Sequence, residues 1–186
     1  MNTYDFDETI YIKDSSVTFY KFCLKHYPFA VLRTVPRTLF KAAEKALGKI
    51  DMTELKEQIF AFLNYIDVDS TLEKFWDEKL DGVGEWYLAQ KRDDDIIISA
   101  SPEFLLQPVA NKLGVKLIAT RMDKHTGKIT GKNCHDSEKV RRFYEAYPGA
   151  HTECFYSDSL SDSPMADIAD TAYMVCRGKL SPWPGK

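Results

Sequence analysis

The sequence predicts an α/β protein with a parallel sheet at its core and a block of helices inserted after the first strand. A short strand-like segment at residues 2–6 opens the chain, and residues 15–89 then show helical periodicity. From residue 90 onward, strand-like and helix-like segments alternate. Such alternation is typical of a parallel sheet covered by helices. We therefore divide the chain into a core, residues 1–14 and 90–186, and a helical domain, residues 15–89.

The first predicted strand carries an unusual acidic pattern. Thr3, Tyr4 and Phe6 favour an extended backbone. Asp5 and Asp7 nevertheless stand where a buried strand should be apolar, and the strand is expected to run into a loop at Asp7. Two carboxylates in this position require a chemical explanation.

The helical segment should contain about four helices, because two groups of apolar residues recur at helical spacing. Val17, Phe19, Tyr20, Phe22, Cys23 and Leu24 form the first group, and Leu55, Ile59, Phe62, Leu63 and Ile66 form the second. Asp51 or Thr53 is placed to cap the start of the second helix. Breaks are expected at Pro28, Pro36, Gly48, Gly82 and Gly84.

Between these two groups the sequence predicts a basic amphipathic helix. Its basic residues are four apart (Arg33, Arg37, Lys41, Lys45 and Lys49), and its apolar residues fall on another face (Leu32, Val35, Leu39, Phe40, Ala43 and Leu47). Two interpretations remain open. Either the apolar face packs on neighbouring helices, as is usual for a surface helix, or the helix lies on an anionic membrane. Pro36 is expected in the first turn or at a break of this helix.

The second half of the chain supplies the other strands of the core. Ile96, Ile97 and Ile98 form an apolar run typical of a strand buried on both faces. A helix should follow from Glu103 to Leu113 and end at Gly114. The remaining elements are, in order, a strand at 115–120, a turn at 123–128, a helix at 137–146, a strand at 153–156, a helix at 164–169 and a last strand at 173–176.

The composition excludes several classes of protein. The 186 residues are 44% hydrophobic with a net charge of −3, which gives a globular chain no general attraction for nucleic acid. Four scattered cysteines disfavour a zinc site or a disulfide framework and favour the reducing cytoplasm. No signal peptide is visible, and no apolar run approaches the roughly 18 residues of a membrane span. We expect a cytoplasmic protein without a transmembrane segment; peripheral membrane contact and the oligomeric state stay open.

Four predicted strand ends carry or lead to polar residues of a particular kind. In a doubly wound sheet, ligands bind beyond the carboxyl ends of the strands. The four sets are Asp5 with Asp7, Ser99 with Ser101, Lys139 on the helix at 137–146, and Asp158 with Asp162. We expect all of them to meet at one edge of the sheet.

This combination of side chains suits phosphoryl transfer. Converging carboxylates favour a hard cation with oxygen ligands, such as Mg²⁺, while a hydroxyl, free N–H groups and a lysine neutralise a phosphate. One carboxylate is then free to attack phosphorus, and a second can protonate the leaving oxygen and later activate water. The sequence thus predicts a Mg²⁺-dependent phosphatase that acts on a small phosphorylated substrate through an aspartyl-phosphate.

The four sets, in this order, resemble the motifs of the haloacid dehalogenase-like (HAD) superfamily of phosphohydrolases. The matching segments are DFDET, IIIS, Lys139 and SDSLSDSP. Within the superfamily the chain looks most like the phosphoserine phosphatase-like branch (class IB), which carries a helical cap between the first and second motifs. The resemblance implies a Rossmann-like three-layer core with a parallel sheet, and it makes residues 15–89 the cap.

The resemblance also implies roles for the first motif. Asp5 matches the nucleophile that becomes phosphorylated and also binds Mg²⁺. Asp7 matches the general acid/base and offers its backbone carbonyl to the metal. Thr9 matches the residue that steadies this loop, and we group it with the phosphate-binding residues.

The other motifs complete the implied site. Ser99 supplies a phosphate-binding hydroxyl and Ala100 a neighbouring N–H group. Lys139 matches the lysine that holds nucleophile and phosphate together; Lys132 is a weaker rival because it precedes the helix. In the fourth motif Asp158 matches a direct metal ligand, and Asp162 supports the metal site through water or Lys139.

The substrate is less well defined by the sequence. Phosphoserine phosphatases carry a glutamate nine places after the nucleophile, where this chain has Asp14 followed by Ser15. An Asp-Ser pair there is more like relatives of the bacterial phosphatidylglycerophosphate phosphatase. On the cap side, Asp14, Arg33 and Arg37 are candidate substrate contacts. A phosphoserine-like metabolite is the first expectation; a lipid head-group phosphate and a non-catalytic HAD-fold binding protein are the alternatives.

Overall fold

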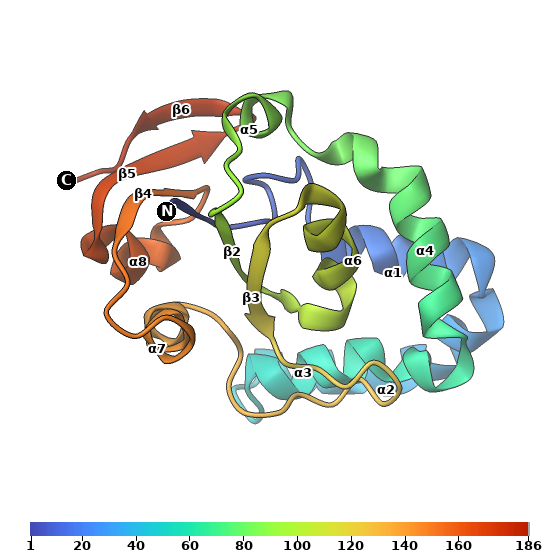
Figure 1. Cartoon of the computed structure of the whole chain (residues 1–186). Coiled ribbons are helices and arrows are strands. Elements are labelled where there is room, and N and C mark those ends of the chain that lie inside the picture. The colour runs from blue at the N-terminus through green and yellow to red at the C-terminus, as the bar shows by residue number, and fades with distance from the viewer. Residues whose placement is uncertain (186) are drawn as a thin grey trace.

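A computed structural model describes residues 1–185 and shows one six-stranded sheet with helices on both faces (Figure 1). The strands are β1 (Thr3–Tyr4), β2 (Ile96–Pro102), β3 (Lys116–Thr120), β4 (Thr152–Ser157), β5 (Ala169–Cys176) and β6 (Lys179–Pro182). Their order across the sheet is β3-β2-β1-β4-β5-β6. Strands β1 to β5 are parallel, whereas β6 pairs antiparallel with β5. The predicted α/β architecture is confirmed.

The antiparallel strand β6 was not predicted, since the last strand was expected at 173–176. In the structure β5 turns back through two residues, Arg177 and Gly178, with φ values of 51° and 75°. Positive φ at both central positions is characteristic of the tight turn that matches the twist of a hairpin. Arg-Gly lacks the usual Asn-Gly or Asp-Gly signature of such a turn, which is why the sequence did not reveal it.

The order of the strands determines where a ligand can bind. The chain moves from β1 outward through β2 and β3 on one side, and then crosses to β4 and β5 on the other. Strand β1 therefore lies at the centre, and the crossovers diverge between β1 and β4. A crevice opens beyond the carboxyl ends of the strands at such a switch point.

Side chains of β2 alternate between the two faces of the sheet. Ile97 belongs to a hydrophobic cluster that includes Leu105 of α6 (Glu103–Leu113). Ile96 and Ile98 belong to a second cluster, which includes residues of α7 (Ser137–Ala146) and α8 (Ser163–Ile168). The triple isoleucine is thus buried on both faces, as predicted.

The inserted segment contains one more α-helix than expected. Its elements are α1 (Ser15–His26), α2 (Pro28–Ala46), α3 (Met52–Ile59), α4 (Val68–Lys79) and α5 (Glu85–Gln90), with 3₁₀ helices η1 (Phe60–Tyr65) and η2 (Leu80–Gly82). Asp51 caps α3 by accepting a hydrogen bond from the N–H of Glu54 at 2.9 Å. The second apolar group crosses from α3 into η1, which shortens the helix predicted there.

One hydrophobic cluster joins the inserted helices to the sheet. Trp76 of α4 packs edge-on against Phe6 and Tyr11, with ring centroids 6.0 and 5.6 Å apart. Its indole Nε1 donates to the carbonyl of Leu105 in α6 at 2.7 Å. The helices and the sheet therefore share a core in this structure; the division of the chain into core and cap domains stays a prediction.

Helix α2 differs from the sequence prediction in the position of Pro36, and its apolar face does not pack on the neighbouring helices. It begins at Pro28 and runs through Pro36 without a break, so the placement of Pro36 in the first turn or at a break was wrong. Its buried residues are Val31 and Thr34, whereas the predicted apolar face is exposed except at Val35, which is half-buried. The helix is held by α1, α3 and η1 along its other side, beside α3 in Figure 1.

Replacement of Trp76 by alanine should destabilise the whole fold. The change removes a fully buried ring and a buried hydrogen bond, which typically costs about 3–5 kcal/mol of unfolding free energy. Leu88→Ala, at a half-exposed position on α5, is the control and should change the free energy by less than about 0.5 kcal/mol. Urea denaturation measures both. Two separate transitions in the wild type would contradict a shared core.

Candidate active site

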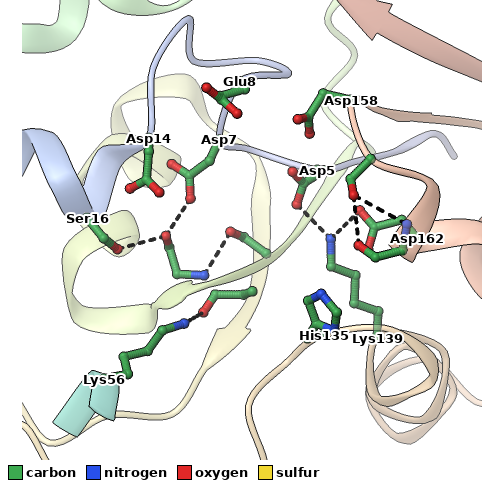
Figure 2. Close-up of a pocket in the computed structure, with 15 residues that line it drawn as sticks. Asp5, Asp7, Glu8, Asp14, Ser16, Lys56, His135, Lys139, Asp158 and Asp162 are labelled. Atoms are coloured by element: carbon green, nitrogen blue, oxygen red, sulfur yellow. Dashed lines mark hydrogen bonds and ion pairs between the residues drawn. The ribbon is translucent and has the colours of Figure 1, made fainter. Parts of the chain in front are cut away.

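The site is built on the loop that follows β1. The N–H of Asp5 donates to the carbonyl of Tyr156 at 2.8 Å, which continues the pairing of β1 with β4 by one residue. The chain then turns back, with the N–H of Tyr11 bonded to the carbonyl of Phe6 at 2.8 Å and a φ of 55° at Glu8. Asp5 directly follows the central strand β1, and the turn keeps Asp7 near it, so both line the pocket shown in Figure 2.

Lys139 forms the centre of the site. Its Nζ lies 2.7 Å from Oδ1 of Asp5 and 2.7 Å from Oδ2 of Asp162. The hydroxyl of Ser157 donates to the same Asp162 oxygen at 2.7 Å. The Lys139 side chain is 2% exposed, so its charge is offset by protein carboxylates rather than by water. The first turn of α7 carries Lys139, as the sequence predicted.

The electrostatics of this cluster leave Lys139 protonated at neutral pH. Burial disfavours its ammonium, but the negative charges of Asp5 and Asp162 outweigh that effect, so the pKa of Lys139 is raised. Burial also raises the pKa of Asp5, while Lys139 pulls that pKa in the opposite direction. Two carboxylates share a single ammonium, which leaves the cluster suited to a further cation.

Asp7 is held separately from Asp5. Its Oδ1 accepts a hydrogen bond from the N–H of Ser15 at 2.7 Å, and its Oδ2 accepts one from the hydroxyl of Ser101. Burial raises the pKa of Asp7, although these two hydrogen bonds oppose the shift. A carboxyl group with a raised pKa is suited to donate a proton at neutral pH.

The second half of β2 supplies the second part of the site through Ser99, Ala100 and Ser101. Ser99 is buried, and its hydroxyl accepts from the N–H of Ser101 at 3.1 Å. The carbonyl of Ala100 accepts from the hydroxyl of Thr120 at 2.8 Å. The bond from Thr120 joins this part of β2 to β3, and Ser99 and Ala100 line the cavity.

Thr9 positions Asp158 and does not face the cavity. Its hydroxyl donates to Oδ1 of Asp158 at 3.2 Å and accepts from the N–H of Asp158 at 3.0 Å. The side chain is almost fully buried by these contacts. These bonds hold the first loop and the loop after β4 together, while the grouping of Thr9 with phosphate-binding residues stays a prediction. Burial raises the pKa of Asp158.

A cavity of about 310 Å³ unites most of the residues proposed from the sequence. They come from the first loop up to the N-cap of α1, from β2, from α7 and from the loop after β4, and are Asp5, Asp7, Asp14, Ser99, Ala100, Lys139, Asp158 and Asp162. Arg33 and Arg37 do not line this cavity: Arg33 lies over the ring of Tyr65, and Arg37 lines a separate hollow between α2 and α3. Lys132 does not line it either.

Sequence reasoning missed Lys56, which reaches the cavity from α3. Its Nζ donates to the carbonyl of Ala100 at 2.9 Å and to Oδ1 of Asn133 at 3.0 Å. Burial lowers the pKa of Lys56. Ser16 and His135 also line the cavity. No local signal distinguishes Lys56 from the solvated lysines of the inserted helices, because the contact depends on how α3 packs against the second half of β2.

The carboxylates around the cavity suit Mg²⁺, which needs few protein ligands, better than a metal that is held entirely by side chains. Within residues 1–185, no group of three or more His, Cys, Asp or Glu side chains is arranged to hold a metal. Asp5 and Asp158 line one space (Figure 2), and Oδ1 of Asp162 is buried without a hydrogen-bond partner among the described residues. Mg²⁺ commonly uses one or two carboxylates together with water and substrate oxygens, which matches this set.

Comparison with known proteins identifies the family. The family model described as haloacid dehalogenase-like hydrolase matches residues 3–167. The chain belongs to this family. The resemblance drawn from the four motifs is thereby confirmed, and the enzyme is a haloacid dehalogenase-like hydrolase.

Relatives of this haloacid dehalogenase-like hydrolase cover nearly its full length. Protein CicA of Caulobacter vibrioides is 31% identical over 95% of this chain and 86% of its own. A Bordetella pertussis Tohama I protein of unknown function superposes with a TM-score of 0.75 at 21% identity, covering 100% of this chain and 91% of that chain. A substrate-bound phosphoserine phosphatase shares the fold, with a TM-score of 0.58 at 14% identity over 91% of this chain and 82% of that one.

Lys139→Met should destabilise the protein in a pH-dependent way. The variant leaves Asp5 and Asp162 buried without their cation, which typically costs about 3–5 kcal/mol. Because burial raises the pKa of Asp5, the folded variant retains a proton that the unfolded chain releases, so its stability falls as pH rises. Urea denaturation in EDTA, between about pH 5 and pH 8, measures the effect.

Lys132→Met is the matched control, since Lys132 is an exposed lysine that does not line the cavity. It should leave stability nearly unchanged at every pH. An equal cost of Lys139→Met across the pH range would contradict the proposed charge balance.

Proposed function

We propose that this protein is a Mg²⁺-dependent phosphomonoester hydrolase that works in the cytoplasm through a phosphorylated Asp5. The observation that supports this most directly is the convergence of Asp5, Asp7, Ser99 and Lys139 on one cavity. Each group suits a different part of phosphoryl transfer, and together they cover nucleophile, proton donor and charge neutralisation. Bound Mg²⁺, held by Asp5, Asp158 and the carbonyl of Asp7 with support from Asp162, would neutralise charge on the phosphoryl oxygens.

In the first step Asp5 attacks the phosphorus atom of the substrate. The bond from phosphorus to the ester oxygen breaks as the bond to an Asp5 oxygen forms. Lys139 holds Asp5 in place at 2.7 Å and, with Ser99 and the N–H of Ala100, stabilises the charge on the transferring group. Asp7 gives its proton to the leaving oxygen, so the product leaves as a neutral alcohol.

In the second step Asp7 acts as a base. Its carboxylate removes a proton from water, the water oxygen attacks phosphorus, and the bond to Asp5 breaks to release inorganic phosphate. The hydrogen bonds from Ser15 and Ser101 keep Asp7 in one orientation through both steps. The raised pKa of Asp7 supports the first of these roles, because burial makes the group hold its proton more tightly until the leaving oxygen takes it.

The side of the cavity formed by α1 and α3 indicates a small polar substrate. Asp14, Ser16 and Lys56 line it in addition to the motif residues. A carboxylate, a hydroxyl and an ammonium in that position suit a metabolite with its own charged groups, such as a phosphoserine-like compound. The inserted helices, acting as a cap, would thus contribute substrate contacts through α1 and α3.

A second candidate substrate class is a phosphate on a lipid head group. One observation favours it: the apolar face of α2 is exposed to solvent. Phosphate release from phosphoserine, sugar phosphates and nucleotides, compared with release from lysophosphatidyl head groups, distinguishes the two classes.

Asp5→Asn should abolish hydrolysis. Asparagine cannot form the acyl phosphate, so the rate on p-nitrophenyl phosphate should fall by about 10³-fold or more. Asp167→Asn, an exposed aspartate on α8, is the control and should retain activity. EDTA should abolish the hydrolysis by the wild type, and added Mg²⁺ should restore that activity. Hydrolysis by the Asp5→Asn variant would contradict the proposed mechanism. A wild type that hydrolyses none of the substrates would favour a non-catalytic binding protein.

Asp7→Asn should accumulate the phosphorylated enzyme. The hydroxyl of Ser101 can accept as well as donate, so the asparagine side chain fits the same hydrogen bonds. Without a base for the second step, turnover should slow by about 10²–10⁴-fold. Mass spectrometry of the quenched enzyme should find phosphate on Asp5. Turnover at the wild-type rate would refute the role assigned to Asp7.

A further inference from the structure

Helix α2 presents an apolar stripe to solvent. Phe29, Leu32, Leu39, Phe40 and Leu47, at its start, along its length and at its C-cap, are 89%, 54%, 65%, 62% and 70% exposed. With 3.6 residues per turn these positions fall within an arc about 100° wide. Five large apolar side chains on one exposed arc make a contiguous surface, and such surfaces mark sites of interaction.

The packed side of α2 is the more polar one. Thr34 is buried there, and the hydroxyl of Thr38 donates to the carbonyl of Gln58 at 3.4 Å. Nζ of Lys41 lies 2.9 Å from a carboxylate oxygen of Glu44. A surface helix normally buries its apolar stripe. Because α2 is attached by the opposite side, the stripe is left free to contact something outside this chain.

The charge around the stripe indicates a negatively charged partner. Residues 28–49 contain five basic residues and one acidic residue, in a chain whose net charge is −3. Arg33 and Arg37 are exposed beside the stripe. The guanidinium of Arg33 lies 4.8 Å from the ring centroid of Tyr65. An apolar surface edged by cations matches the interface of an anionic membrane, where acyl chains lie beneath acidic head groups.

We propose that α2 docks this protein on the surface of anionic phospholipid membranes. The 19-residue helix is about 28 Å long and would lie parallel to the membrane, with Phe29 and Phe40 among the acyl chains and Arg37 at the head groups. In residues 1–185 no helix is long and apolar enough to cross a bilayer, so the attachment is peripheral. This proposal concerns where the protein acts and does not depend on the proposed reaction.

A second copy of this chain is a poorer occupant. A two-fold contact between α2 helices would place the same surface on both sides of the axis. The exposed guanidinium groups of Arg33 and Arg37, which lie beside the stripe in each copy, would then approach each other. Like charges across an interface oppose association, whereas acidic head groups attract the same residues.

Sedimentation with lipid vesicles tests the proposal. The wild type should pellet with vesicles of equimolar phosphatidylglycerol and phosphatidylcholine, and about ten-fold less with phosphatidylcholine alone. The double variant Phe29→Ser/Phe40→Ser should bind the anionic vesicles about ten-fold more weakly or worse. Leu88→Ser, on α5 at the opposite end of the molecule in Figure 1, is the matched control and should bind like the wild type.

Both substituted phenylalanines are exposed, so the double variant should fold and hydrolyse p-nitrophenyl phosphate at the wild-type rate without vesicles. Arg37→Glu should weaken binding to anionic vesicles, and added salt should do the same to the wild type. The proposal is overturned if the wild type stays in the supernatant, or if the double variant pellets equally well. It is also overturned if light scattering finds a dimer that the double variant abolishes, because α2 would then bind a second copy.

Vesicle binding by a protein inactive on every phosphate ester would support the docking surface and reject the reaction. Hydrolysis without vesicle binding would support the reaction and reject the docking surface.

Discussion

The ammonium of Lys139, buried between Asp5 and Asp162, is the interaction on which the site depends. The first loop, the loop after β4 and helix α7 each contribute one member of this cluster. Without the shared cation, carboxylates from two loops would repel each other in a region of low dielectric constant. The same ammonium fixes the direction of Asp5 and leaves its second oxygen for other partners. Charge balance and positioning are thus supplied by a single residue.

The topology of the sheet explains why this cluster forms where it does. Strand β1 is central, and the chain departs from it in opposite directions to form the two halves of the sheet. Asp5 and Asp158 directly follow β1 and β4, and Ser99 lies in the second half of the neighbouring parallel strand β2, so their side chains meet at one edge. The helices inserted between β1 and β2 begin at that edge, which brings Asp14, Ser16 and Lys56 over the same cavity.

The inserted helices serve two different surfaces. Helices α1 and α4 share the apolar core of the sheet, with Phe19 and Trp76 in the same cluster as Phe6. Helix α2 is joined to its neighbours by a partly polar side and turns its largest apolar residues outward. Lys56 of α3, packed beside α2, reaches the cavity. The helical segment therefore lies between the candidate active site and the proposed membrane surface.

The sequence by itself determined the features that depend on local chemistry. Gly114 ends α6 in the left-handed conformation, the helix at 137–146 has the predicted bounds, and the motif residues follow the strands that position them. Only the tertiary structure decided that Lys56 joins Lys139 in the cavity, that Thr9 bonds Asp158, and which face of α2 is buried. Periodicity shows that a helix has an apolar face, but the surface that covers that face is contributed by residues distant in the chain, or by no residue of the chain at all.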